Sequence, residues 1–422
     1  MLSWFVWKEY YGKIVGGQAK LCGYGSMLLE ILFYRYNSIC EPDVIAALGK
    51  LGITVVEKNI RSSGKELSEG QLAEQTADLI RKHSFLFVFS INFFPNLSDI
   101  CELLQVPYIC WTVDVPVLTL FSQAVKNKCN RIFLFDRSQY LYFKERNPEG
   151  IFYLPLATNP DRWDRVIGSA SDSEKKRFES GISFVGSLYS EKNAFRKIEG
   201  MSDYAKGYIR GLVEAQLLVY GANLIEGSLT DEIMNKLDPL VPDMHQPLCE
   251  GDRAAQRYLI AHSFIGSELA QTERVRMLNA LAAYFDVDLY TLSNTEELSC
   301  VRRHGGVNSQ TEMPLVFHES RINLNITMRP IATGLSLRVF DVCGCGGFLM
   351  TNWQEELPEM YEPGVEVEYF TSEEELLEKA GYYLEHEDER KAIALRGYER
   401  TKSEHTYDSR IAEMIRVVNG TL

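Results

Sequence analysis

The sequence lacks a long apolar run: no stretch of its 422 residues reaches the roughly 18 apolar residues that a membrane-spanning helix needs. It also lacks a basic excess, because 58 Asp and Glu stand against 44 Lys and Arg, a net charge of −14. That charge disfavours nucleic acid and anionic membrane surfaces as partners. The start MLSWFVWKEYYGK lacks the basic region, apolar core and small-residue site of a signal peptide, so we expect a cytoplasmic protein.

Metal and redox motifs are scarce. Nine cysteines, an odd number scattered along the chain, do not indicate a disulfide framework. Cys343 and Cys345 come nearest to a zinc motif, but no second pair accompanies them, so we expect small buried residues there. The seven histidines are dispersed, and no DxD-like triplet follows a predicted strand. No predicted strand is followed by G-x-G-x-x-G, which disfavours a nicotinamide dehydrogenase. We expect no metal and no required cofactor.

The length of the chain favours two domains, because it exceeds what one core usually supports. In the first half, nearly continuous Val, Ile and Phe runs alternate with helical patterns, which predicts a doubly wound α/β domain over residues 27–160. Residues 1–26 join no pattern and stay unassigned. The predicted strands cover residues 28–34, 53–56, 86–91, 108–113, 132–135 and 152–154.

The second half predicts another Rossmann-like domain. Residues 161–180 are polar and are expected to be the interdomain linker. The second domain then covers 181–390, with a helical insertion at about 190–263 that packs on the domain's flank or forms a homodimer contact. Helices over residues 391–422 end the chain.

The stretch 321–352 indicates chemistry. A buried strand (322–326), a loop, a short helix (about 335–342) and a second strand (348–350) form one βαβ unit of a parallel sheet. The N-terminus of such a helix lies at the carboxyl edge of the sheet, where free N–H groups and the helix dipole suit a phosphate.

Several residues of this unit are candidates for a nucleotide-sugar site. Gly334 allows a close backbone approach, and Arg329 and Arg338 offer forked donors to an anion. Arg329 could instead make a surface ion pair, and Arg338 could pair with Asp341, three residues away on the helix. After the strand at 182–185, which ends at Gly186, Ser187 and the N–H groups after Gly186 could hold the diphosphate, although a tight Gly turn after any strand looks similar. The remaining candidates in the loop are Thr333, Leu335 and Ser336.

Residues directly after strands of the first domain are candidates for the acceptor side, because ligands bind beyond the carboxyl ends of parallel strands. These are Asn37, Ser38, Asn92 and Asp114. Asp114 has no Lys or Arg beside it in sequence and is a candidate general base. The alternative is that Asp114 caps a following helix from the DVP turn.

The same residues carry a family resemblance. The run SRINLNIT…TGLSLRVFDVCGCGGFLMTN, with EELPE after it, resembles the donor-binding half of group-1 glycosyltransferases of GT-B fold. More narrowly it resembles the CgeB-type (spore-maturation-protein-like) glycosyltransferases. Five upstream motifs match that family in order, so that the resemblance extends from about Leu28 to the C-terminus: SINFFP, YICWTVDVP, FLFDRS, YLPLAT and SFVGSLYSEKN.

The resemblance implies a GT-B architecture, with two Rossmann-like domains facing across a cleft and a terminal helix crossing back to the first domain. It implies transfer of a sugar from a nucleotide-diphosphate donor, by default a UDP-sugar, to a hydroxyl of a protein or surface glycan in a bacterium. Asp341 matches the residue for the ribose hydroxyls. Many retaining relatives carry another acidic residue eight positions earlier, where this chain has Thr333, so inversion or retention stays open.

Three readings of function follow. The leading one is a metal-independent glycosyltransferase, in which arginines and helix N-termini stabilise the leaving diphosphate. A second is a nucleotide-sugar epimerase of GT-B shape, which needs acid and base residues around the sugar. A third is a degenerate subunit that binds a sugar nucleotide or glycan without catalysis, for which Thr333 is the best support.

Overall fold

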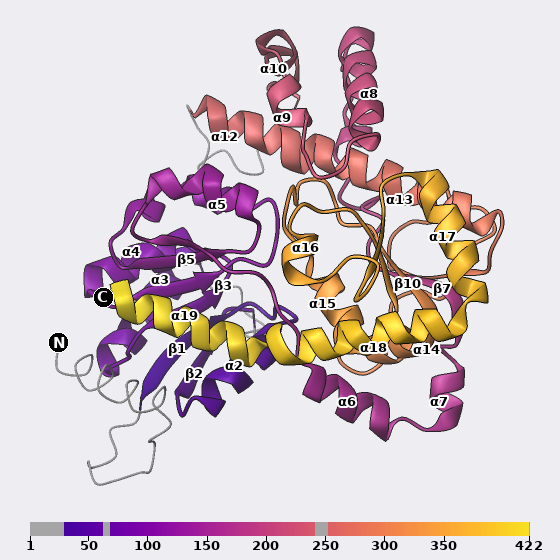
Figure 1. Ribbon diagram of the computed structural model, residues 1–422. Coiled ribbons are helices and arrows are strands. Elements are labelled where there is room, and N and C mark those ends of the chain that lie inside the picture. Colours follow the sequence, from indigo (N-terminus) through magenta and orange to yellow (C-terminus); the bar gives the residue numbers. More distant parts are fainter. Residues whose placement is uncertain (1–28, 62–67, 241–251, 422) are drawn as a thin grey trace. The chain divides into compact units, whose positions relative to one another are not determined.

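The computed structural model describes residues 29–61, 68–240 and 252–421, and these form two units (Figure 1). Unit 1 contains the described residues up to Leu154 together with helix α19 (Tyr407–Thr421), and unit 2 contains Pro155–Thr406. The unassigned N-terminal segment 1–26 lies outside the described residues.

Unit 1 is built on a six-stranded parallel sheet of order β2-β1-β3-β4-β5-β6. The central strands are fully buried and mostly apolar, as is typical of strands covered on both faces. Helices α2 and α19 pack against each other, whereas α3 packs against α4. Helix α2 connects β1 to β2 in one direction along the sheet, and α3 connects β2 to β3 in the opposite direction. Because both connections are expected to be right-handed, the two helix pairs cover opposite faces of the sheet. The elements before Leu154 are β1 (Glu30–Arg35), α2 (Glu41–Lys50), β2 (Thr54–Asn59), α3 (Glu69–Lys82), β3 (Val88–Ile91), α4 (Pro95–Leu104), β4 (Tyr108–Trp111), η1 (Leu118–Phe121), η2 (Gln123–Lys126), β5 (Asn130–Leu134), α5 (Arg137–Phe143), η3 (Lys144–Arg146) and β6 (Ile151–Tyr153).

Unit 2 is built on a second six-stranded parallel sheet, of order β12-β11-β10-β7-β8-β9. Its strand order reverses between β7 and β10, which are hydrogen-bonded neighbours in parallel register. Its elements are α6 (Pro160–Ser169), α7 (Asp172–Lys176), β7 (Ser180–Val185), η4 (Phe195–Lys197), α8 (Asp203–Leu217), α9 (Ile225–Ser228), α10 (Asp231–Leu237), α12 (Arg253–Tyr258), η5 (Leu259–Ile265), α13 (Gly266–Ala282), β8 (Val287–Tyr290), β9 (Arg302–Arg303), α14 (Met313–Glu319), β10 (Ser320–Asn325), α15 (Leu337–Gly344), β11 (Leu349–Asn352), α16 (Leu357–Met360), β12 (Glu368–Phe370), α17 (Glu373–Glu385) and α18 (Glu387–Glu404).

Most of the segment 161–180, which was predicted as the interdomain linker, is helical. Helix α6 begins with Pro160 and is capped by Asn159, whose side chain accepts the N–H of Arg162 at 3.2 Å. Its Trp163 is buried. Helix α7 starts with a capping box at Ser171. The polar composition belongs to the solvent faces of two short helices.

The expected helical insertion has a hydrophobic core of its own. Helices α8, α9 and α10 pack with η5, a π-helix, and with the start of α13 (Figure 1). This second core is separate from the one under the sheet and consists of Met201, Ala205, Ile209, Val213, Ile225, Leu229, Ile233, Met234, Leu237, Ile260, Ala261, Phe264, Ile265 and Leu269. A self-contained apolar core accounts for the helical periodicity of the sequence here. A homodimer contact stays a prediction.

The C-terminal boundary differs from the expected one. Helix α18 lies wholly within unit 2, where it packs on α15, and only α19 belongs to unit 1. The aromatic ring of Tyr407 in α19 lies 6.0 Å from that of Trp111 in β4. The segment that joins unit 1 therefore begins at Tyr407, not near residue 391.

Candidate functional site

The site in unit 2 forms where the strand order reverses. The carboxyl ends of β7 and β10 are adjacent there, and this switch point is where open α/β sheets bind ligands. The loop after β7 carries Gly186 and Ser187, and the loop after β10 leads into α15. The structure therefore brings the two predicted donor-side segments to one edge of one sheet.

Arg329 is not a surface residue. Its guanidinium is 3% exposed and lies 2.6 Å from Oε1 of Glu273, whose side chain is fully buried. It also donates to the carbonyl of Val219 at 3.2 Å and stacks over the ring of Tyr220 at 3.9 Å. The two charges therefore neutralise each other, and the ion pair that the sequence analysis raised as an alternative is present, but buried.

Thr333 lies beside a carboxylate from another element. Its hydroxyl donates to Oε1 of Glu356 at 2.7 Å, and the N–H of Glu356 donates to the Thr333 carbonyl at 3.0 Å. Glu356 is 1% exposed and stands in the segment after β11. The fold thus places the carboxylate of Glu356 beside Thr333, although position 333 itself holds no acidic residue.

Helix α15 begins at Leu337, two residues later than predicted, with Ser336 as its N-cap. The Ser336 side chain makes no capping bond, and its hydroxyl lies 3.3 Å from that of Thr327. Gly334 and Leu335 are buried in the loop before it. The first N–H groups of a helix have no acceptor within the helix, so this end can receive an anion.

Arg338 and Asp341 lie on the same helix, 3.6 Å apart. Asp341 is buried and accepts a hydrogen bond from Thr158 at 2.7 Å, so it holds α15 against the start of unit 2. Arg338 is partly buried over the ring of Phe317 at 4.9 Å, and burial lowers the pKa of its guanidinium. The ion pair between Arg338 and Asp341 that was considered as an alternative is therefore present, although its 3.6 Å separation is long for an ion pair.

The turn after β7 uses its polar groups internally. The N–H of Leu188 donates to Oγ of Ser293 and that of Tyr189 to Oγ of Ser187, both at 2.8 Å. The Ser187 hydroxyl donates to Glu191 at 2.7 Å. The N–H groups at positions 188 and 189, which the sequence suggested as free donors after Gly186, are therefore already satisfied.

Sequence analysis missed Arg274. This residue of α13 donates through Nη1 to the carbonyl of Ser187 at 2.5 Å and through Nη2 to that of Ile326 at 2.6 Å. It thus joins the ends of β7 and β10 across the switch point. Its place within a helical pattern of mixed polarity contained no signal for this role.

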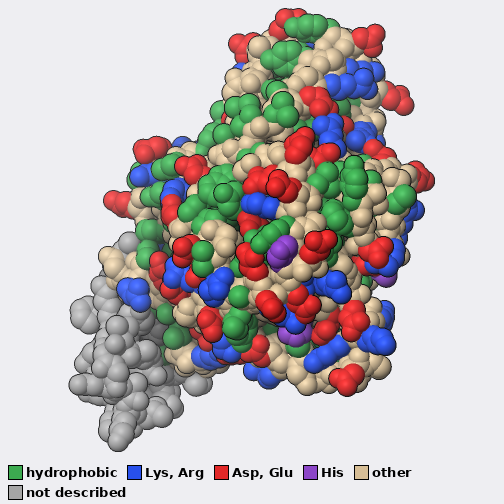
Figure 2. Space-filling model, turned by 45° about the vertical axis from the view of Figure 1, so that its right-hand side comes forward, with side chains coloured by type: hydrophobic (Ala, Val, Ile, Leu, Met, Phe, Trp, Pro, Cys, Tyr) green, Lys and Arg blue, Asp and Glu red, His purple; other side chains and the backbone are tan. Residues whose placement is uncertain are grey.

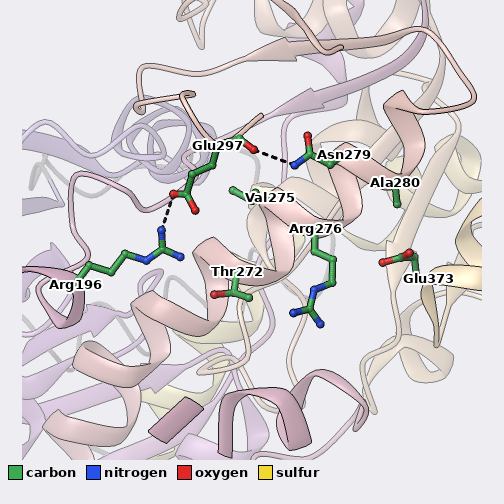
Figure 3. A pocket seen from close by; sticks show the side chains of 8 residues that line it. All are labelled: Arg196, Thr272, Val275, Arg276, Asn279, Ala280, Glu297 and Glu373. Carbon is green, nitrogen blue, oxygen red and sulfur yellow. Dashed lines mark hydrogen bonds and ion pairs between the residues drawn. The ribbon is translucent and has the colours of Figure 1, made fainter. Parts of the chain in front are cut away.

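A separate hollow of about 500 Å³ lies on the solvent face of α13 (Figure 3). It contains none of the predicted site residues, and its two arginines, Arg196 and Arg276, are paired with Glu297 and Glu214. Its lining residues are Arg196, Thr272, Val275, Arg276, Asn279, Ala280, Glu297 and Glu373. Because both cations are paired, this hollow is a weaker candidate for an anion than the switch point.

In unit 1 the predicted acceptor-side residues meet at the switch point between β1 and β3. Nδ2 of Asn92 donates to Asp114 at 2.7 Å and to the hydroxyl of Tyr36 at 2.9 Å, and its Oδ1 accepts the N–H of Val113 at 3.0 Å. Asn92 and Asn37 both have left-handed backbones, with φ of 58° and 69°, which cost energy in a residue with a side chain.

Asp114 is not a helix cap. The next helical turn, η1, begins only at Leu118, with Val117 at its N-cap and no side-chain capping bond. Asp114 is exposed, and Asn92 fixes its carboxylate. Burial and the negative charge of Asp114 raise the pKa of Tyr36, which sequence reasoning had not singled out. Ser38 lies nearby, with its hydroxyl 3.2 Å from Sγ of Cys40.

Part of the chain matches a known protein family. Residues 273–416 match the family described as glycosyl transferase-like. No curated protein sequence matches the chain significantly. The matched segment runs from α13 into α19 and includes the loop after β10 and helix α15.

Several solved structures share the fold at low sequence identity. HepE from Anabaena, solved in complex with UDP and glucose, is 11% identical, with a TM-score of 0.53 over 93% of this chain and 100% of that one. A glycosyltransferase from Rickettsia africae has a TM-score of 0.50 at 10% identity, over 94% and 99% of the two chains. Sucrose-phosphate synthase from Thermosynechococcus elongatus has a TM-score of 0.50 at 10% identity, over 93% and 98%. The predicted α/β fold with two doubly wound sheets of GT-B type is confirmed.

Two further observations concern metals and membranes. In the part of the chain that the structure describes, no three His, Cys, Asp or Glu side chains are placed to share a metal ion. Cys343 and Cys345 are free and buried, and burial raises the pKa of the Cys343 thiol to about 12. Within the described ranges, no helix is both long and apolar enough to cross a membrane.

Acidic and basic side chains are interspersed over the described surface that Figure 2 shows.

Proposed function

We propose that this protein is a glycosyltransferase that moves a sugar from a nucleotide-diphosphate sugar to a hydroxyl acceptor. The observation that carries the proposal is where the family match falls: residues 273–416 build the carboxyl edge of the second sheet, including the loop after β10 and the N-terminus of α15. HepE shares the fold and was solved with UDP and with UDP-glucose, which supports a UDP-sugar as donor.

On the donor side, the N-terminus of α15 receives the diphosphate. The positive end of its dipole favours an anion, and Arg338 adds a positive charge within the first turn. Asp341 and Arg329 support this site mainly by fixing the helix and the loop, through Thr158 and Glu273 respectively. Donors of this kind stabilise a leaving diphosphate without a metal ion.

On the acceptor side, Asp114 is the proposed general base. Asn92 holds its carboxylate at the switch point of the first sheet, and the group is exposed and able to accept a proton from a hydroxyl. The acceptor class, a protein or a surface glycan, and the CgeB-type assignment rest on the resemblance in sequence.

The buried carboxylate of Glu356 favours an enzyme over a degenerate binding subunit. The strongest support for a degenerate subunit was Thr333 in place of an acidic residue. Glu356 lies 2.7 Å from the Thr333 hydroxyl, so the same neighbourhood does contain a carboxylate. A site that has lost catalysis has no need to keep a buried acid beside its ligand, because burial of a carboxylate is costly.

The proposal is tested by thermal stabilisation with a panel of nucleoside diphosphates and their sugar conjugates. A ligand that binds only the folded state stabilises it by RT ln(1 + [L]/Kd), about 2.7 kcal/mol at 100 times Kd. We expect one nucleoside diphosphate to raise the melting temperature of the wild type. The Arg338→Ala variant should lose most of that increase, because it removes a charge at the helix N-terminus.

Arg321→Ala is the matched control. Arg321 is an exposed arginine at the start of β10, at the opposite edge of the same sheet, so its loss should leave the nucleotide response unchanged. If no nucleotide stabilises the wild type, the donor function is wrong. If Arg338→Ala and Arg321→Ala respond alike, the site has been placed on the wrong residues.

A further inference from the structure

Arg274 is the residue that spans the switch point of the second sheet. Its side chain reaches from α13 to the carbonyls of Ser187 and Ile326, which follow β7 and β10. Its guanidinium lies 4.8 Å from the ring of Tyr189 and 5.5 Å from that of Phe184. It is thus fixed at the place where an open α/β sheet binds its ligand.

No ion pair with a described residue neutralises the charge of Arg274. The residue is only 9% exposed, and no carboxylate of the described residues comes within ion-pair distance of it. Its Nε is buried without a hydrogen-bond partner. Burial lowers the pKa of the guanidinium, which reflects the cost of keeping a cation out of water. Arginine stays protonated under such conditions, so the charge persists.

The surroundings of Arg274 differ sharply from those of Arg329. Arg329 has Glu273 at 2.6 Å, whereas Arg274, which follows Glu273 along α13, is held by two backbone carbonyls and the Tyr189 side chain, with no carboxylate of the described residues within ion-pair distance. The ammonium of Lys192 lies 5.6 Å from the Tyr189 ring that also contacts Arg274. Glu191, an exposed residue, directs its carboxylate to the hydroxyls of Ser187 and Ser190. Glu273 and Glu191 act on Arg274 only from beyond ion-pair distance, so a bound anion is the group that would pair with this buried cation directly.

We propose that Arg274 binds a phosphate group of the donor nucleotide at this switch point. The identity of the ligand as a donor nucleotide rests on the proposed function. Its chemical class, a phosphate anion, follows from the surroundings of Arg274 alone. The guanidinium is held by two carbonyls and keeps further N–H groups, so it offers forked donors at a fixed position without the cost of ordering a free side chain.

The test uses inorganic pyrophosphate and nucleoside diphosphates, with affinities measured by calorimetry on the full-length chain. We expect Arg274→Gln to lower affinity for both by about 10- to 100-fold, the range for losing a hydrogen bond to a charged group. Arg274→Lys, which keeps the charge, should recover part of that loss. Arg276→Gln is the matched control, because Arg276 lies on the solvent face of the same helix and pairs with Glu214.

Circular dichroism and the melting temperature without ligand establish that each variant folds. If Arg274→Gln folds and binds pyrophosphate as the wild type does, Arg274 is only a clamp between two strand ends, and the inference is wrong. If the wild type binds pyrophosphate through Arg274 but no nucleotide, the phosphate site stands and the glycosyltransferase proposal fails. If nucleotides bind equally to wild type and Arg274→Gln, the donor proposal stands and Arg274 has no part in it.

Discussion

The arginines at the carboxyl edge of the second sheet differ in what surrounds them. Arg329 is enclosed with Glu273 and Tyr220, and its ion pair is removed from solvent. Arg338 has Asp341 only at 3.6 Å, and Arg274 has no carboxylate within ion-pair distance among the described residues. We therefore expect Arg274 and Arg338 to provide the positive charge at the proposed donor site, and Arg329 to contribute mainly to stability.

Replacing Arg329 with methionine tests this division. The change leaves the Glu273 carboxylate buried without its partner, which costs about 3–5 kcal/mol of unfolding free energy. The double variant Arg329→Met, Glu273→Leu should recover most of the loss, because it removes both charges. Urea denaturation of the wild type, both single variants and the double variant measures the coupling. A single variant of wild-type stability that has lost nucleotide binding would instead assign Arg329 to the phosphate.

At the scale of elements, the turn from α15 into β11 depends on close backbone approach. A Cβ on Gly347 would lie 2.4 Å from the carbonyl oxygen of Phe317, and Gly346 has a φ of 71°. Gly344 packs as closely, since its Cβ would lie 2.6 Å from Cγ2 of Thr158. These glycines let α15 and β11 sit tightly on their neighbours, and so fix where the N-terminus of α15 points.

We expect Gly347→Ala to lower the unfolding free energy by about 1–3 kcal/mol, because the backbone must shift to admit the methyl group. Gly211→Ala is a suitable control. Gly211 lies in the middle of α8 with nothing within 4 Å of the added Cβ, so the change should stabilise the helix by up to about 1 kcal/mol. Denaturant midpoints measure both effects, and a neutral Gly347→Ala would show that this approach is not tight.

At the scale of the whole molecule, unit 1 is assembled from both ends of the described chain. Helix α19 packs on α2, and Lys50 pairs with Asp408 at 2.5 Å. Its buried side chains include Ile411, Met414 and Val418. Each such side chain contributes about 1.5–3 kcal/mol by burial, so several together approach the roughly 5–15 kcal/mol stability of a domain.

Truncation after Thr406 should therefore unfold unit 1 and leave unit 2 folded, although the removed residues lie far in sequence from the rest of unit 1. Hydrogen exchange read by mass spectrometry distinguishes the two units, with rapid exchange expected for β1 to β6 alone. Removal of residues 420–422 serves as the control, since Gly420 has open space around it. Protection retained throughout unit 1 after the longer truncation would mean that α19 is dispensable.

Much of the architecture was determined by the sequence. Each of the six predicted strands of unit 1 overlaps an observed one, and the prediction rested on apolar runs because strands covered on both faces are largely apolar. The βαβ unit around residues 321–352 was predicted from its apolar runs in the same way. Asn37, Asn92 and Asp114 were predicted as site residues for a different reason, because side chains that follow parallel strands share one edge of the sheet. The helices of the polar segment 161–180 were not predicted, since a solvent-exposed helix and a linker have similar compositions.

Only the tertiary structure decided which partner each charged group has. Glu273 and Arg329 are 56 residues apart, Thr158 and Asp341 are 183 apart, and Thr333 meets Glu356 through a different strand-end segment. Arg274 reaches the switch point only because α13 packs on β8 and on the apolar core of the second sheet. The local sequence pattern indicates which residues are buried and in which direction the backbone runs. Which group neutralises a charged side chain depends on the distant segments that the fold places next to it.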